Sequence, residues 1–255
     1  MRPPPYDTPD TPDTPDASGP VLVAVAHGTR DPAGPATVRA LLDRVRAMRP
    51  WLPVAAAYAE ISDPSLEEAL ADTPSPAVVV PLILARGYHA QRDIPERVAQ
   101  VAQGAHRRGC GDTVIARPLG PHALLAAVLA DRLGPIRHAE AVVLGAAGSA
   151  HPAGIVDVRV AARLLARRLR RPVPYGFVAA GAPALPDVVA DLRRRGSRRV
   201  AVASYLLAPG HFHERVLRAG ADEVSPPIGV HDAVAGLILR RFDEASVRAR
   251  AALAG

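Results

Sequence analysis

VLVAVAHGTRDPAG, at residues 21–34, joins a strand, a polar turn and the start of a helix in one short segment. Its first part, VLVAVA (21–26), is uniformly apolar, as expected for a parallel strand that helices cover on both faces. Beyond the turn, apolar residues recur at positions 38, 41, 42, 45 and 48, which is the spacing of one helix face. The segment therefore predicts the strand–helix unit from which parallel sheets are built.

The same alternation continues along the chain and then restarts. Further strands are expected at 52–58, 77–84, 112–117, 141–147, 172–179 and 198–207. Helices are expected near 64–71, 91–107, 121–133, 154–170, 184–195, 210–219 and 231–249. Alternation of this kind predicts parallel sheets with right-handed crossover connections.

An internal duplication divides the chain. LGPHALLAAVLADRL (119–133) matches IGVHDAVAGLILRRF (228–242), and PLILARG (81–87) matches SYLLAPG (204–210). The predicted fold is therefore α/β, with two similar doubly wound lobes, each with a small parallel sheet, and a boundary near 135–139. We expect an N-terminal lobe at 20–136 and a C-terminal lobe at 137–255, facing each other across a cleft of the kind that binds ligands.

Residues 1–19 repeat the tripeptide TPD and contain little that a fold could bury. This composition predicts a disordered tail, to which we assign no function.

Composition narrows the class of function. The net charge of +6 suggests an acidic partner, or simply a solvated arginine face, while 4% aromatic residues provide few stacking surfaces for nucleic acid. The single cysteine, Cys110, excludes an internal disulfide. No apolar run is long enough for a membrane span, and the N-terminus lacks a secretory apolar region. We expect a cytoplasmic protein that binds neither nucleic acid nor membrane.

Three residues with metal-binding side chains follow successive predicted strands. His27 follows the first strand, Glu60 the second and His89 the third. Parallel strands bring their carboxyl ends to one edge of the sheet. Two imidazoles and a carboxylate at one edge suit a divalent first-row metal ion, although each residue alone has a local structural explanation.

The duplication provides an internal control for this site. His27 aligns with Ala147, Glu60 approximately with Ala179, and His89 approximately with Phe212, which His211 and His213 flank. Residues that maintain the fold should recur in both halves, whereas residues of a single site need not. His122 recurs as His231, so we interpret that pair as mainly structural.

Other polar residues surround the two histidines. Thr29 and Arg30 follow His27, while Arg86, Tyr88 and Arg92 bracket His89, and we expect these five residues to contact an anionic ligand. Ser149 lacks the G-x-S-x-G context of a nucleophile elbow. The chain also lacks the glycine patterns of nucleotide-binding loops.

These motifs resemble a known family. HGTRDP (27–32), PLILARGYHAQRDIP (81–95), LGPH (119–122), AAGSAHP (146–152) and SYLLAPG (204–210) are similar to segments of the sirohydrochlorin chelatases, over roughly residues 20–245. Histidine phosphatases also end a strand in His-Gly, but they place an arginine before the histidine, where this chain has Ala26.

The resemblance implies an ATP-independent lyase that inserts Fe²⁺ or Co²⁺ into sirohydrochlorin, for sirohaem or cobalamin, and needs no other cofactor. It implies that His27 and His89 bind the metal and accept protons, and that Glu60 binds the metal, orients a histidine or accepts a proton. The eight carboxylates of sirohydrochlorin would suit the basic body. The fused form implies a monomer with one active lobe and one degenerate lobe. A carrier of tetrapyrrole or metal, without turnover, is the alternative.

Overall fold

The structure is a computed structural model that describes residues 19–73, 76–105, 113–134 and 139–253. It contains two four-stranded parallel sheets. The first has the order β2-β1-β3-β4 and the second β6-β5-β7-β8. The strands are β1 (Val21–Ala26), β2 (Val54–Tyr58), β3 (Ala77–Pro81), β4 (Thr113–Ile115), β5 (Ala141–Ala146), β6 (Tyr175–Phe177), β7 (Val200–Tyr205) and β8 (Glu223–Val224). The predicted α/β fold of two parallel lobes is confirmed.

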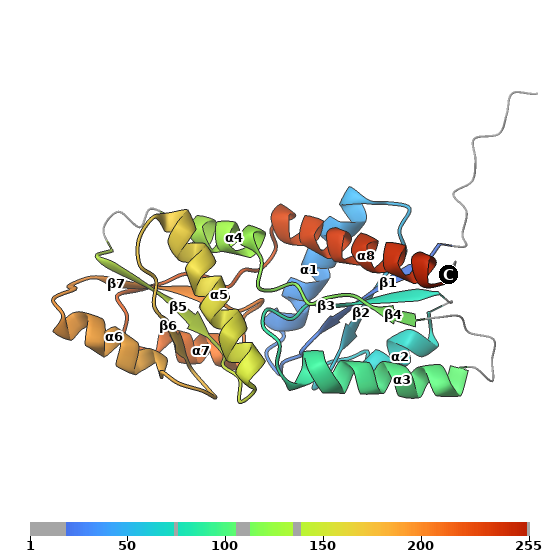
Figure 1. The fold of residues 1–255 in the computed structure, drawn as a ribbon, viewed down its shortest axis with the longest axis horizontal. Helices are drawn as coiled ribbons and strands as arrows, with labels where there is room; N and C mark the ends of the chain where they lie inside the picture. The colour runs from blue at the N-terminus through green and yellow to red at the C-terminus, as the bar shows by residue number, and fades with distance from the viewer. Residues whose placement is uncertain (1–18, 74–75, 106–112, 135–138, 254–255) are drawn as a thin grey trace, which may run out of the picture.

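Helices cover both faces of each sheet (Figure 1). They are α1 (Ala33–Met48), α2 (Leu66–Ala71), the π-helix η1 (His89–Asp93), α3 (Ile94–Ala105), α4 (Ala123–Leu133), α5 (Pro152–Leu169), α6 (Leu185–Arg194), α7 (His211–Leu217) and α8 (Asp232–Leu253). Alternate residues of β1 divide between two hydrophobic clusters: Leu22 and Ala24 face one helix layer, and Val23 and Val25 face the other. This is why the strand is apolar throughout.

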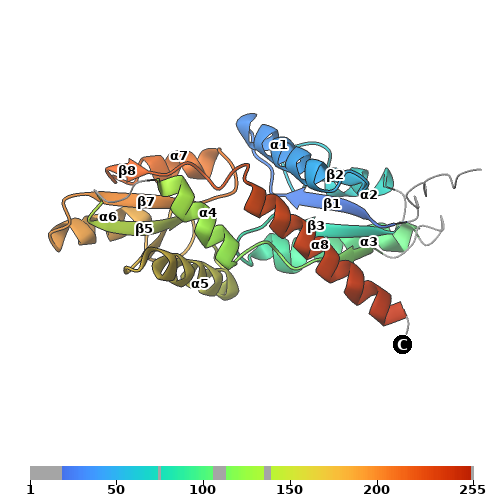
Figure 2. The ribbon, with the colours of Figure 1, turned by 90° about the horizontal axis from the view of Figure 1, so that it is seen from above.

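The two halves of the chain exchange their last helices. α4 packs against α5 and β7 of the second sheet, and α8 packs against α1, β3 and β4 of the first. Figures 1 and 2 both show α8 beside α1 and α4 beside α5. We therefore define the N-lobe as the first sheet with α1–α3 and α8, and the C-lobe as the second sheet with α4–α7.

The predicted boundary of the sequence repeat is therefore not the spatial boundary of the lobes. Residues 135–138 lie outside the described residues. α4 and α8 each have an apolar stripe, and such a stripe can pack on any sheet whose apolar face is within reach. Here each stripe packs on the sheet of the other half.

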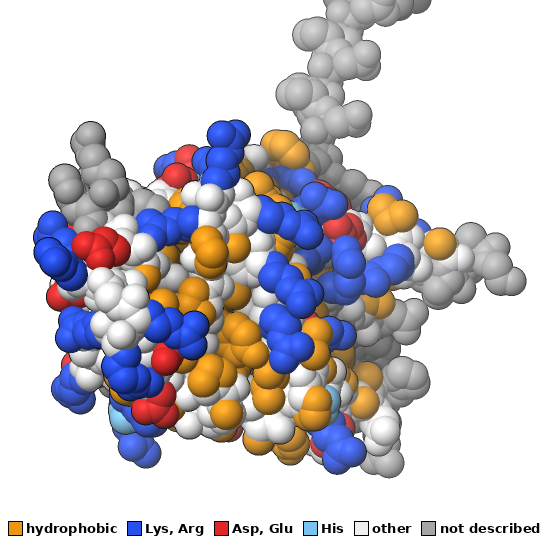
Figure 3. Space-filling model, turned by 60° about the vertical axis from the view of Figure 1, so that its left-hand side comes forward, with side chains coloured by type: hydrophobic (Ala, Val, Ile, Leu, Met, Phe, Trp, Pro, Cys, Tyr) orange, Lys and Arg blue, Asp and Glu red, His pale blue; other side chains and the backbone are white. Residues whose placement is uncertain are grey.

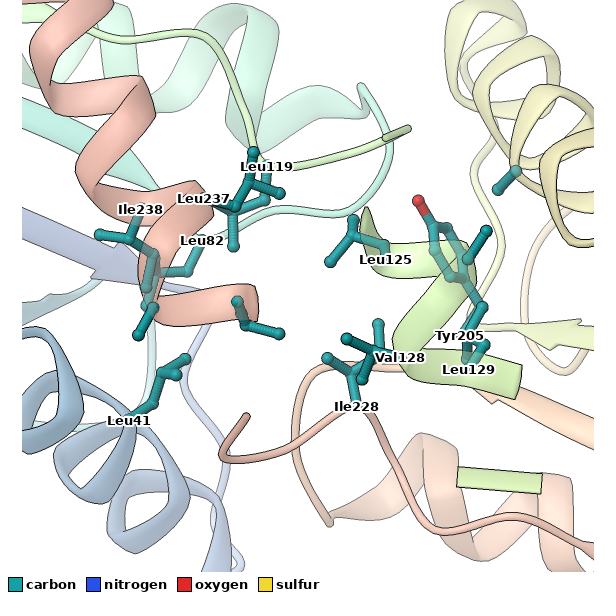
Figure 4. Packing of buried hydrophobic residues seen from close by; sticks show 14 of the residues in the cluster. Leu41, Leu82, Leu119, Leu125, Val128, Leu129, Tyr205, Ile228, Leu237 and Ile238 are labelled. Atoms are coloured by element: carbon teal, nitrogen blue, oxygen red, sulfur yellow. The ribbon is translucent and has the colours of Figure 1, made fainter. Parts of the chain in front are cut away.

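One hydrophobic cluster runs from lobe to lobe (Figure 4). Leu237 and Ile238 of α8 and Leu41 of α1 lie on the N-lobe side, and Leu125 and Val128 of α4 lie on the C-lobe side. All five side chains are at most 1% exposed. Continuous burial of this kind joins the lobes into one packed unit.

Polar contacts secure the exchanged helices. Arg49 forms a two-pronged ion pair with Asp243 of α8, with N–O distances of 2.6 and 2.9 Å.

The Nδ1 atoms of His122 and His231 accept hydrogen bonds from the Leu124 and Ala233 amides, at 3.1 Å in both cases. These histidines cap the starts of α4 and α8, so each has a local structural role.

The predicted disordered tail, apart from Gly19, lies outside the described residues. Among the helices that the structure describes, none is long and apolar enough to cross a membrane.

Candidate functional site

A cleft of about 850 Å³ lies between the lobes, where the carboxyl ends of both sheets meet. The predicted site residues His27, Thr29, Arg30 and Tyr88 line it. The C-lobe supplies mainly small and apolar wall residues: Ala146, Ala147, Gly148, Ala179, Ala180, Leu206, Leu207, Ala208, Pro209 and Phe212. Such a cavity suits a ligand with a large apolar body.

The backbone after β1 brings His27 beside the Glu60 loop. The Glu60 amide donates to the His27 carbonyl oxygen at 2.9 Å. Gly28 has φ of +94°, and a Cβ there would collide with the Glu60 carbonyl oxygen. The His-Gly pair therefore allows two strand-end loops to touch.

Side chains also join these two loops. The Thr29 amide donates to Ser62 Oγ at 3.2 Å, and Ser62 Oγ donates to the Thr29 carbonyl at 3.1 Å. From α3, Arg97 donates to the Ala59 carbonyl and pairs with Glu67 of α2. The hydrogen bond to Arg97 lowers the pKa of Glu67. Arg97 thus ties the helix that follows η1 to the Glu60 loop, and no sequence motif indicated this role.

The His89 backbone begins η1, after the loop that follows β3. Its side chain lies outside the described part of the structure. Among the side chains that are described, His, Cys, Asp and Glu form no group of three that could hold a metal ion. The structure therefore brings the His27 and Glu60 loops together and places His89 after β3, while the predicted metal site stays a prediction.

The C-lobe repeats the scaffold of this site without its side chains. The Ala179 amide donates to the Ala147 carbonyl at 2.9 Å, as Glu60 does to His27. This bond confirms the proposed equivalence of His27 with Ala147 and of Glu60 with Ala179. The backbone arrangement is duplicated, but His27 and Glu60, which are predicted to bind metal, are replaced by alanines in the second copy.

Ile61 also lines the cleft, although no sequence pattern indicated it. Its φ of +66° is unusual for a β-branched residue, and its side chain is 58% exposed. Backbone strain of this kind is often found at ligand sites. Tyr88, 60% exposed, also lines the cleft. These two side chains offer apolar surface to a ligand.

The predicted anion-binding arginines differ in their surroundings. Arg30 is exposed and lines the cleft, and Arg92 is exposed on η1. Arg86 instead pairs with Asp157 of α5, whose hydrogen bond raises the pKa of Arg86. On the face shown in Figure 3, cationic side chains border a central area of hydrophobic ones.

Two histidines of α7 lie on the C-lobe wall. His211 is exposed, and His213 is half-buried. The Nε2 atom of His213 is buried and has no hydrogen-bond partner among the described residues. These residues occupy the place that the loop around His89 has in the N-lobe.

Comparison with known proteins shows where this architecture occurs. The family model described as CbiX matches residues 21–135 and again residues 141–245. The sirohydrochlorin ferrochelatase of Priestia megaterium is 24% identical over 84% of this chain and 86% of its own. The sirohydrochlorin cobaltochelatase of Methanosarcina acetivorans is 30% identical over 44% of this chain and 92% of its own. The structure of SirB from Bacillus subtilis with Fe³⁺ superposes with a TM-score of 0.74 and 25% identity, over 91% of this chain and 97% of that one.

Proposed function

Because the chain belongs to the CbiX family, we propose that it is a chelatase that inserts Fe²⁺ or Co²⁺ into sirohydrochlorin. One observation supports this most strongly. A single cleft has a duplicated backbone scaffold, and only one copy carries His27 and Glu60. A metal site in one lobe and an apolar wall in the other suit a metal ion that meets a flat macrocycle.

The chemistry follows from the residue types. Entry of a divalent metal releases two pyrrole N–H protons. A neutral imidazole binds first-row metals and accepts protons near pH 7. We assign His27 and His89 to presenting the metal and accepting these protons. Glu60 binds the metal, orients a histidine or takes up a proton.

Other cleft residues would hold the macrocycle. Ile61 and Tyr88 provide apolar contacts at the mouth of the cleft, and Thr29 donates or accepts hydrogen bonds there. Arg30 and Arg92 suit the carboxylates at the rim of the ligand. The reaction needs no nucleotide in this scheme. We expect a monomer, because one chain supplies both walls of the cleft. We also expect a cytoplasmic location.

The test is anaerobic conversion of sirohydrochlorin with Fe²⁺ or Co²⁺, followed by its absorption spectrum. The protein should accelerate conversion beyond one equivalent of product. His27→Ala and His89→Ala should abolish the acceleration, and His151→Ala, at an exposed helix cap outside the cleft, should retain it. Full rates in both site variants would reject the assignment, and conversion that stops at one equivalent would favour a carrier.

The metal preference needs a separate measurement. Imidazole and carboxylate ligands discriminate only modestly between Fe²⁺ and Co²⁺. Competition between equal concentrations of the two ions, with product analysis by mass spectrometry, gives the intrinsic preference of this chain.

A further inference from the structure

Two C-lobe side chains hold the segment that leads from β3 to His89. The Tyr205 hydroxyl donates to the Leu84 carbonyl oxygen at 2.8 Å. The Asp157 carboxylate accepts from Arg86 three times: from the backbone amide at 2.7 Å, from Nε at 2.9 Å and from Nη2 at 2.8 Å. A carbonyl and an amide of residues 84–86 are thus held by the opposite lobe.

Both of these side chains are buried at the lobe interface. Asp157 is 2% exposed and Tyr205 is 3% exposed. A buried carboxylate is costly unless it is paired and fully hydrogen-bonded, and Arg86 satisfies both of its oxygens. Burial, followed by the charge of Asp157, raises the pKa of Tyr205, so the hydroxyl remains a proton donor.

Two glycines permit the close approach that these contacts need. A Cβ on Gly120 would collide with both the Leu84 carbonyl oxygen and the Tyr205 hydroxyl. A Cβ on Gly154 would lie 2.6 Å from the Arg86 carbonyl oxygen. Gly120 belongs to the LGPH motif, so this packing gives that motif a physical reason.

The duplication shows that the contacts act in one direction. Leu82 stands where the C-lobe has Tyr205, and it has no hydroxyl to donate. Pro209 stands where the N-lobe has Arg86, and it has no N–H. Thr37 takes the place of the carboxylate and instead donates to its own helix at Ala33. The N-lobe therefore cannot hold the C-lobe loop in the equivalent way.

We propose that Asp157 and Tyr205 are positioning residues, through which the C-lobe fixes the loop that carries His89 against His27. The proposal rests on the proposed function. His89 follows the held segment after only Gly87 and Tyr88, so the anchor lies immediately before the metal-binding position. Displacement of a reacting group by about 1 Å lowers rates strongly. The lobe that lacks the site residues is thus required for the site of the other lobe.

The test compares Tyr205→Phe and Asp157→Asn with Asp243→Asn. Asp243→Asn is the control. Like Asp157, Asp243 binds an arginine guanidinium through both carboxylate oxygens, but its partner is Arg49, away from the cleft. Three readouts are combined: amide hydrogen exchange in residues 84–94, the ligand-field spectrum of bound Co²⁺, and kcat and KM for sirohydrochlorin. The first two do not depend on turnover.

We expect exchange in residues 84–94 to rise about fivefold in Tyr205→Phe and about a hundredfold in Asp157→Asn. The Co²⁺ spectrum and kcat should change less in Tyr205→Phe than in Asp157→Asn, while KM stays within about threefold of wild type. Asp243→Asn should leave the exchange, the spectrum and the kinetics unchanged. If Asp157→Asn does not fold, Tyr205→Phe decides. Unchanged exchange and spectrum in a folded Tyr205→Phe would overturn the positioning role. A wild-type protein that converts no sirohydrochlorin would instead overturn the proposed function.

Discussion

Ile238→Ala on α8 tests whether the exchanged helices join the two lobes into one unfolding unit. Ile238 is fully buried in the cluster that extends from lobe to lobe. Its truncation removes buried apolar groups and leaves a cavity, which costs about 2–5 kcal/mol in well-packed cores. For a chain of this size, each kcal/mol lowers the melting temperature by about 2–4 °C. A loss of about 3 kcal/mol therefore predicts a melting temperature that is lower by about 6–12 °C.

The assay is differential scanning calorimetry with urea unfolding, and hydrogen exchange reports on each lobe. The wild type should unfold in a single transition, and Ile238→Ala should shift protection in β1 and in β5 together. Val247→Ala is the matched control, because this side chain of the same helix is 66% exposed. It should change stability by less than about 0.5 kcal/mol. Two separate transitions, with only the N-lobe affected, would refute the argument that the exchange couples the lobes.

Three further predictions concern single positions. Gly28→Ala should reduce conversion of sirohydrochlorin by at least about tenfold, because φ of +94° and the contact with the next loop exclude a Cβ. In thermal denaturation, Gly28→Ala and Gly148→Ala should lower the melting temperature by similar amounts. Gly148→Ala should reduce turnover less than Gly28→Ala does. Ile61→Gly should relieve about 1 kcal/mol of backbone strain while raising KM, so a stability gain with unchanged KM would count against a substrate contact. Burial lowers the pKa of His122 below 6.5, and the charge of Arg241 lowers it further. The cap that His122 forms therefore stabilises the fold fully above pH 6.5, and this stabilisation is lost as the pH falls through the lowered pKa. In urea titrations at several pH values, the stability of His122→Ala should depend less on pH in that range.

The strands and their parallel arrangement were predictable from local pattern. VLVAVA at 21–26 is apolar at every position because both faces of β1 are buried, and a strand of that kind requires helices on both sides. The duplicated motifs predicted two lobes and one retained set of metal-binding residues. β8 (Glu223–Val224) was not predicted, because two residues of a partly exposed edge strand carry no apolar run.

The site was predictable only as far as strand order and motif allow. The position of His27 after β1 follows from periodicity, and its place beside Glu60 follows from parallel pairing. Ile61 gave no signal, because its unusual backbone angle depends on loop contacts and not on residue type. Arg97 gave no signal either, because its pairing with Glu67 depends on how α2 and α3 pack together.

The sequence by itself determined the alternation of strands and helices, the internal duplication and the residue types of the predicted metal site, because these depend on residue type at short spacing. Only the tertiary structure decided which sheet each terminal helix covers, since an apolar stripe suits either lobe. It also decided the partner of Arg86, which appeared from sequence to be a free cation for an anionic ligand. Asp157 lies 71 positions away, and folding brings that carboxylate to the loop before His89. Such pairings depend on contacts between distant segments, which no local pattern encodes.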